Sequence, residues 1–246
     1  MIPLRDDVPS RSFPIVTLAL IALNVVAFVM EVGMGRQLDR FFYQAAVIPA
    51  LYTGGDRSLG PLEAVVTTFN PDLGGRVFLS MFLHGGWLHI AGNMLYLWIF
   101  GDNVEDRMGH FRYLVFYLLC GWSASYAHIW SAPDSRVPSI GASGAIAGVL
   151  GAYITLFPRA RVVTLLPLGL FTQVVAVPAV FFLAFWFLQQ FLAGALTVAA
   201  PTAQTGGVAW WAHIGGFAAG FVLVGVFSRR RPRGRDAGWP RPGSRD

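Results

Sequence analysis

The side chains that could perform chemistry are concentrated in three short apolar segments. FLHGGWLHIAGNM carries His84, His89 and Asn93, GASGA carries Ser143, and AHIGGFAAG carries His213. Polar groups in such segments are functional candidates, because hydrocarbon offers them no water. A serine hydroxyl becomes a nucleophile when a neutral histidine within hydrogen-bond reach accepts its proton. We therefore predict that Ser143 is a nucleophile and His213 its general base.

A serine nucleophile also needs hydrogen-bond donors for the oxyanion of the tetrahedral intermediate. Three uncharged donors are available, namely the Asn93 amide, the His89 ring and the Ser143 backbone N–H. His89 and Asn93 are four residues apart, so they share one face of a helix. Every Asp and Glu lies in a predicted loop, tail or helix end, which leaves no acid to orient the histidine. The sequence therefore predicts a dyad rather than a triad.

Each of these residues also has a structural interpretation. A serine among glycines and alanines commonly packs helices together, and a lone histidine or asparagine commonly hydrogen-bonds between them. The sequence lacks the residues of three other hydrolytic mechanisms. A metal site of the HExxH kind is excluded because no His is followed by Glu, and an aspartyl site because no Asp pair lies within an apolar segment. A serine/lysine dyad is excluded because the chain has no Lys. No metal and no cofactor are expected.

The composition indicates what kind of protein must position these groups. Of the 246 residues, 55% are hydrophobic and 13% are charged, against about 25% charged in an ordinary soluble domain. The single cysteine, Cys120, excludes an intramolecular disulfide. The net charge of +5 resides in the tail 229–246, which holds seven Arg and two Asp. We expect no nucleic-acid partner. The sequence predicts an integral membrane protein.

Apolar segments long enough to cross a bilayer define an all-α polytopic protein. The six predicted transmembrane helices cover 12–30, 77–101, 113–133, 137–158, 174–198 and 208–227. They form a membrane domain over 12–228, with an outer loop at 31–76, after an N-terminal tail at 1–11. The basic tail at 229–246 is predicted to be disordered, and either anionic lipid contact or stop-transfer charge explains its arginines.

Arginine placement predicts the orientation of the chain. Thirteen arginines lie in the segments on the side of the termini, against five on the other side. We therefore expect both termini in the cytoplasm and the protein in the cell inner (plasma) membrane. Ser143 and His213 would then share a depth of roughly 10 Å below the outer surface, since each lies six or seven residues into its segment. Small residues, Gly216 and Gly220 among them, recur at four-residue spacing and would let these two helices touch.

Taken together, these motifs resemble the rhomboid family of intramembrane serine proteases, of the bacterial six-helix type. The resemblance covers roughly residues 76–227 and rests on RVFLSMFLHGGWLHIAGNMLYLWIFGDNVEDRMG, GASGAIAGVLGAY and AHIGGFAAG. It implies Ser143 as nucleophile, His213 as base, and His89 with Asn93 in the oxyanion site. It also implies that His84 is a structural hydrogen-bonding residue, that Glu105 and Arg107 brace the loop after the second span, and that the fifth span is a lateral gate. Many members have an aromatic residue under the histidine ring where this chain has Ala147.

We therefore expect an intramembrane serine endopeptidase that cleaves transmembrane segments of other membrane proteins near the outer leaflet. Its partners would be single-span or multi-span membrane protein substrates and the lipid bilayer. One alternative is a non-catalytic rhomboid-like membrane-protein binding factor, which would be expected to have lost the serine or the histidine. Another is a small-molecule permease whose path is lined by Gln189, Gln190 and the histidines, although no inverted repeat and no midplane charge are evident.

Overall fold

The structure is a computed structural model that describes residues 1–53, 73–168, 171–199 and 209–229. Its helices, in chain order, are α1 (Ile15–Met34), η1 (Gly35–Gln37), α2 (Leu38–Ala45), α3 (Pro49–Thr53), α5 (Leu73–Ser80), α6 (Trp87–Met108), α7 (His110–Ser131), α8 (Ser143–Leu156), α9 (Ala179–Ala199) and α10 (Trp210–Phe227). Its strands are β1 (Ile2–Asp6), β2 (Arg161–Leu168) and β3 (Phe171–Pro178). The predicted tail beyond residue 229 and residues 54–72 of the predicted outer loop lie outside the described residues.

Helix α8 is the centre of the bundle and packs against α6, α7 and α10. Its residues from Gly144 to Tyr153 are all buried. A Cβ atom on Gly216 of α10 would overlap the carbonyl oxygen of Gly144, and one on Gly220 would overlap that of Gly148. The small residues therefore allow the backbones of α8 and α10 to touch, as their spacing predicted.

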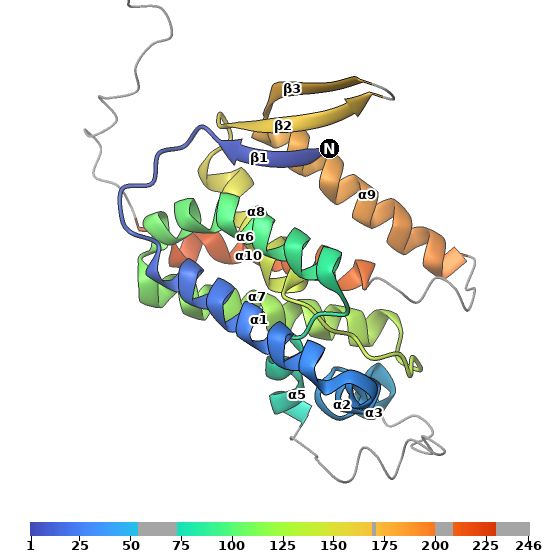
Figure 1. Ribbon diagram of the computed structural model, residues 1–246. Coiled ribbons are helices and arrows are strands. Elements are labelled where there is room, and N and C mark those ends of the chain that lie inside the picture. The colour runs from blue at the N-terminus through green and yellow to red at the C-terminus, as the bar shows by residue number, and fades with distance from the viewer. Residues whose placement is uncertain (54–72, 169–170, 200–208, 230–246) are drawn as a thin grey trace, which may run out of the picture.

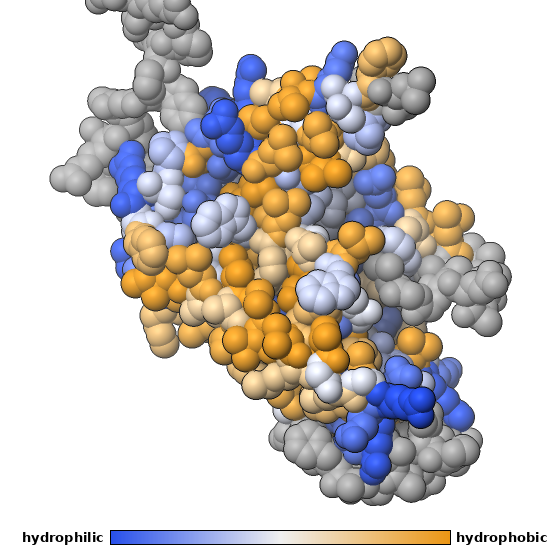
Figure 2. Space-filling view, in the orientation of Figure 1, coloured by the Kyte–Doolittle hydropathy of each residue, from blue (hydrophilic) through white to orange (hydrophobic). Residues whose placement is uncertain are grey.

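The surface of the bundle is apolar over much of its length. Figure 2 shows hydrophobic residues across the middle of one face, with hydrophilic residues gathered mainly towards its ends. Large apolar side chains such as Phe185, Leu192 and Val222 are exposed, which suits contact with lipid. Three of the described helical stretches are long and apolar enough to cross a bilayer, Ile15–Ala45, Ala179–Leu196 and Trp210–Phe227. The helical membrane-protein class is thus confirmed, while the count of six spans is not established by this criterion.

The second predicted span, 77–101, is wrong as a continuous helix. Helix α5 ends at Ser80 and α6 begins at Trp87, so His84 lies in the connecting segment. Two glycines, Gly85 and Gly86, disfavour a helix here. Outside a helix the His84 backbone N–H needs another acceptor, and the Glu31 carboxylate of α1 accepts its hydrogen bond.

The fourth predicted span, 137–158, also starts too early. Ser139 pairs with Val47 in an isolated β-bridge, and Gly141 adopts a φ of 128° that L side chains rarely adopt. Helix α8 therefore begins at Ser143 itself. The serine is the first residue of its helix instead of the seventh of a span, which places its backbone N–H among the donors without an intrahelical partner.

The segment after α8 is a β-hairpin that continues to Pro178, so the fifth predicted span, 174–198, begins too early and α9 starts at Ala179. Strands β2 and β3 pair antiparallel, and β1 pairs with the other edge of β2. Valine-rich stretches and Pro167 favour strands over helix here. The sheet adds β structure to the predicted all-α class and includes residues 2–6 of the predicted N-terminal tail. It lies at one end of the bundle, with α2, α3 and α5 at the other (Figure 1).

Candidate active site

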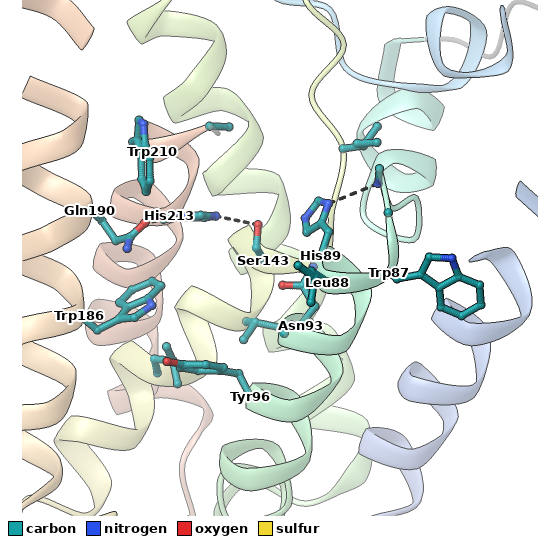
Figure 3. A pocket seen from close by; sticks show the side chains of 17 residues that line it. Trp87, Leu88, His89, Asn93, Tyr96, Ser143, Trp186, Gln190, Trp210 and His213 are labelled. Atoms are coloured by element: carbon teal, nitrogen blue, oxygen red, sulfur yellow. Dashed lines mark hydrogen bonds between the residues drawn. The ribbon is translucent and has the colours of Figure 1, made fainter. Parts of the chain in front are cut away.

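Ser143 and His213 are brought together by the contact between α8 and α10. The Nε2 atom of His213 lies 2.7 Å from the Oγ atom of Ser143 (Figure 3). Ser143 is the first residue of α8 and His213 the fourth of α10. Because Gly216 lies one turn after His213 and touches the backbone of Gly144, the close helix packing positions the ring beside the hydroxyl.

Helix α9 holds the other side of the His213 ring. Its Nδ1 atom lies 2.7 Å from the Oε1 atom of Gln190. An amide oxygen only accepts, so Nδ1 carries the proton and donates it, which leaves Nε2 bare to accept from Ser143. The Trp186 ring lies along the imidazole, with centroids 5.9 Å apart and planes 36° apart. These two residues support the ring in a chain that has Ala147 where many rhomboids have an aromatic residue.

No sequence motif assigns Trp186 and Gln190 to this site. The polar character of Gln190 alone fits a permease path equally well, and Trp186 belongs to no motif. Their spacing of four residues, which puts both on one face of a helix, was the available signal. Nothing in the spacing shows which way that face points, because the rotation of α9 depends on its packing.

Asn93 is oriented by His84. The amide nitrogen of Asn93 lies 2.9 Å from Nε2 of His84. The Nδ1 atom of His84 lies 3.3 Å from the carbonyl oxygen of Phe82 and donates to it, so Nε2 accepts one of the two Asn93 amide hydrogens. His84 therefore holds the Asn93 side chain by one hydrogen bond and leaves its second amide hydrogen available.

His89 lies one turn before Asn93 on α6. Its Nδ1 atom accepts a hydrogen bond from the backbone N–H of Gly85, at 3.3 Å, so the proton resides on Nε2. A Cβ atom on Gly141 would lie 2.8 Å from that Nε2 atom. A side chain at Gly141 would therefore displace the ring, and glycine meets both this close approach and the positive φ at the position.

The side chains of His89, Asn93, Ser143, Gln190 and His213 line a cavity of about 880 Å³. Its walls come from α6, α8, α9 and α10, and they include the apolar side chains of Tyr96, Ile146, Leu150, Trp186 and Trp210. The volume lies in the range of ligand clefts. Its apolar lining would accept an extended segment of hydrophobic polypeptide beside Ser143.

In the described part of the chain, no group of three or more His, Cys, Asp and Glu side chains could hold a metal ion. The histidines of the site instead have identified protein partners. His84, His89 and His213 each bond through Nδ1 to a protein oxygen or to a backbone N–H.

The comparison with known families agrees with this geometry. The Rhomboid domain matches residues 74–230, which is more than half of the chain and includes α6 to α10 and all but the first residue of α5. The chain belongs to the rhomboid family. The family assignment predicted from the motifs is therefore confirmed.

Three relatives illustrate how far the similarity extends. Rhomboid protein 1, mitochondrial, of Saccharomyces cerevisiae is 36% identical over 87 residues, 34% of this rhomboid and 25% of the relative. The human presenilin-associated rhomboid-like protein, mitochondrial, is 34% identical over 107 residues, 42% and 28% of the two chains. Rhomboid protease GluP of Bacillus subtilis is 43% identical over 86 residues, 34% and 16%. This rhomboid therefore matches about a quarter of the length of the first two relatives and less of the third.

The predicted location of this rhomboid in the plasma membrane, with both termini in the cytoplasm, is contradicted by these relatives. The yeast and human proteins are both named as mitochondrial. The reason for the error is physical: arginine counts compare the two sides of a membrane and do not say which membrane it is.

Glu105 and Arg107, which were expected to brace the loop after the second span, lie at the far end of α6 from the site. The buried Glu105 carboxylate accepts hydrogen bonds from the backbone N–H groups of Val16 and Thr17 and from the Thr17 hydroxyl, at 2.7 to 2.9 Å. It also bonds to Nδ1 of His110, at 2.6 Å. The Arg107 carbonyl accepts the Arg229 N–H, which ties the end of α10 to α6.

Proposed function

We propose that this rhomboid is an intramembrane serine endopeptidase that cleaves peptide bonds in or near transmembrane segments of other membrane proteins. The observation that carries the proposal is the 2.7 Å contact between the bare Nε2 of His213 and the Ser143 hydroxyl. This is the arrangement that a histidine needs to accept the proton of a serine nucleophile. The name of the Bacillus subtilis relative, Rhomboid protease GluP, points to the same chemistry.

The reaction follows from the positions of the side chains. As Ser143 Oγ attacks the scissile carbonyl carbon, His213 Nε2 takes the hydroxyl proton. The oxyanion would accept hydrogen bonds from the free amide hydrogen of Asn93, from His89 Nε2–H and from the Ser143 backbone N–H. His213 then returns its proton to the departing amine, which leaves an acyl-enzyme on Ser143. A water molecule, deprotonated by His213, hydrolyses this ester and restores the hydroxyl.

The substrate must present an extended segment to this site. Carbonyl groups in a transmembrane helix already accept hydrogen bonds from the helix itself, so cleavage requires local unwinding. Segments with glycine, proline or polar residues near the scissile bond should therefore be preferred. The cavity between α6 and α9 would receive the unwound segment. The substrate would enter this cavity from the lipid past α9.

The two alternative functions receive less support from the geometry. A non-catalytic binding protein has no need of a serine and a histidine in hydrogen-bond contact. For a permease, the Gln190 amide oxygen would have to bind the transported molecule, yet it already bonds to His213.

The test is cleavage of a single-span substrate by the purified protein in liposomes. Wild type should cleave it and should react with a fluorophosphonate probe at Ser143, since such probes phosphonylate activated serines. Ser143→Ala and His213→Ala should each abolish cleavage. The double variant should be no worse than either, because dyad members act as one unit. Persistent cleavage by purified Ser143→Ala would refute the proposal.

A further inference from the structure

Helix α9 supplies two contacts to the ring of His213 that a serine/histidine dyad does not by itself require. Gln190 accepts a hydrogen bond from Nδ1 at 2.7 Å, and Trp186 lies along the ring at 5.9 Å between centroids. Figure 3 shows both side chains reaching from α9 towards His213. Gln190 is buried, with 8% of its surface exposed, whereas its neighbour Gln189 is exposed.

The chemistry of the Gln190 contact matters because histidine has two tautomers. Only the tautomer with its proton on Nδ1 leaves Nε2 free to accept the proton of Ser143. Gln190 selects that tautomer with an uncharged oxygen. An ionised carboxylate would be costly at this depth of an apolar bundle. In the described part of the chain, His213 Nδ1 has no other hydrogen-bond partner that could replace Gln190.

Both contacts depend on the place of α9. This helix stands to one side of the bundle in Figure 1 and packs mainly against α10. Its other side exposes Phe181, Phe185 and Leu188, and it borders the cavity opposite α6. A displacement of α9 away from α10 would remove both the hydrogen-bond acceptor Gln190 and the neighbouring Trp186 ring from His213.

We propose that Gln190 is a positioning residue for the general base, and that His213 is aligned for proton transfer only while α9 lies against α10. This inference rests on the proposed protease function. It makes Gln190 the structural counterpart of the acid in a serine triad, acting through His213 and not on the substrate. It also means that the helix bordering the substrate cavity controls whether Ser143 is activated.

The test compares Gln190→Met with Gln190→Glu and Gln189→Met. Methionine matches the length of glutamine but lacks a strong acceptor, whereas glutamate keeps an acceptor oxygen. For Gln190→Met we expect kcat to fall on the order of 10-fold to 10²-fold, as for a misplaced catalytic group, with KM changed by less than about twofold. Gln190→Glu should recover most of kcat, because a carboxyl that is neutral at this depth still offers a carbonyl oxygen to His213 Nδ1. Gln189→Met, on the same helix but exposed, should match wild type.

A spectroscopic measurement separates positioning from a general loss of structure. The ¹⁵N signals of the His213 ring, assigned by their disappearance in His213→Ala, report where the ring proton resides. Wild type and Gln189→Met should show the proton on Nδ1, and Gln190→Met should show a mixture of tautomers. Thermal unfolding of the three variants checks that the fold persists.

The outcomes are distinct for the two proposals. Wild-type kcat in Gln190→Met, an unchanged tautomer, or an equal loss in Gln190→Glu would each overturn the role of Gln190 while leaving the protease intact. If wild type neither cleaves substrate nor labels at Ser143, the proposed function itself fails.

Discussion

The side-chain amide nitrogen of Asn93 lies 2.9 Å from Nε2 of His84, so the residue proposed to stabilise the oxyanion is itself held by a histidine outside its helix. The backbone of His84 is in turn held by the Glu31 carboxylate of α1. Three separate elements thus fix the direction of one amide group. Such fixed donors stabilise developing charge without reorganising during the reaction.

Replacing Asn93 should therefore separate transition-state stabilisation from activation of the nucleophile. We expect Asn93→Ala to lower kcat on the order of 10² to 10³, as removal of one oxyanion donor does elsewhere, while fluorophosphonate labelling of Ser143 continues slowly. His84→Ala should lose less, because Asn93 remains but is unrestrained. His89→Ala should resemble Asn93→Ala or be worse. Wild-type kinetics in Asn93→Ala would leave only His89 and the Ser143 N–H as donors.

Helix α10 offers a matched pair of glycines for testing the packing that joins the dyad. A methyl group at Gly220 would overlap the carbonyl of Gly148, whereas one at Gly225 would meet nothing within 4 Å. Gly220→Ala should separate α8 from α10, lower the thermal unfolding midpoint and reduce cleavage. Gly225→Ala should leave both unchanged. Equal behaviour of the two variants would mean that α8 and α10 tolerate a wider spacing than the structure has.

Glu105 should matter for stability and not for chemistry. Its carboxylate accepts hydrogen bonds from the Val16 and Thr17 N–H groups at the start of α1. In Glu105→Ala these two donors lose their acceptor. Each unsatisfied buried donor costs about 1–3 kcal/mol, so the unfolding midpoint in detergent should drop clearly. The kcat of the protein that remains folded should not change, and the exposed Arg112→Ala serves as the control. A loss of kcat with unchanged stability would contradict this role.

The N-terminal strand should make stability depend on pH. Burial raises the pKa of the Asp6 carboxyl from 3.8 to about 7, against the opposing effect of its hydrogen bond from the Tyr153 hydroxyl. A carboxyl with a raised pKa favours the folded state when neutral, so its contribution is complete below about pH 4 and is lost as the pH rises through about 7. The unfolding midpoint should therefore fall as the pH rises from about 4 to about 7.

Two variants test this assignment. Asp6→Asn keeps the position uncharged and should flatten the pH dependence, whereas Asp39→Asn, exposed on α2 at the other end, should retain it. The same slope in Asp6→Asn and wild type would place the titrating group elsewhere.

The sequence by itself determined the membrane class, the rhomboid family and the three segments that carry the polar groups, because these depend on residue type and local spacing. Spacing also showed that the helices of Ser143 and His213 could approach, since glycine and alanine at four-residue intervals leave room for backbones. Hydropathy could not show that Ser143 begins its helix, that 81–86 interrupts a helix, or that 161–178 forms a hairpin. The mean hydropathy of an apolar segment is the same whether the segment is helical or extended.

Only the tertiary structure decided what holds the proposed catalytic groups in place. Gln190 and His213 are 23 residues apart, and their contact depends on how α9 is rotated against α10. His84 reaches Asn93 because the chain breaks before α6, and Glu31 of α1 holds that break from 53 residues away. Hydrogen bonds between such distant residues arise from the packing of whole helices, and no local pattern of residues records the rotation and depth at which those helices meet.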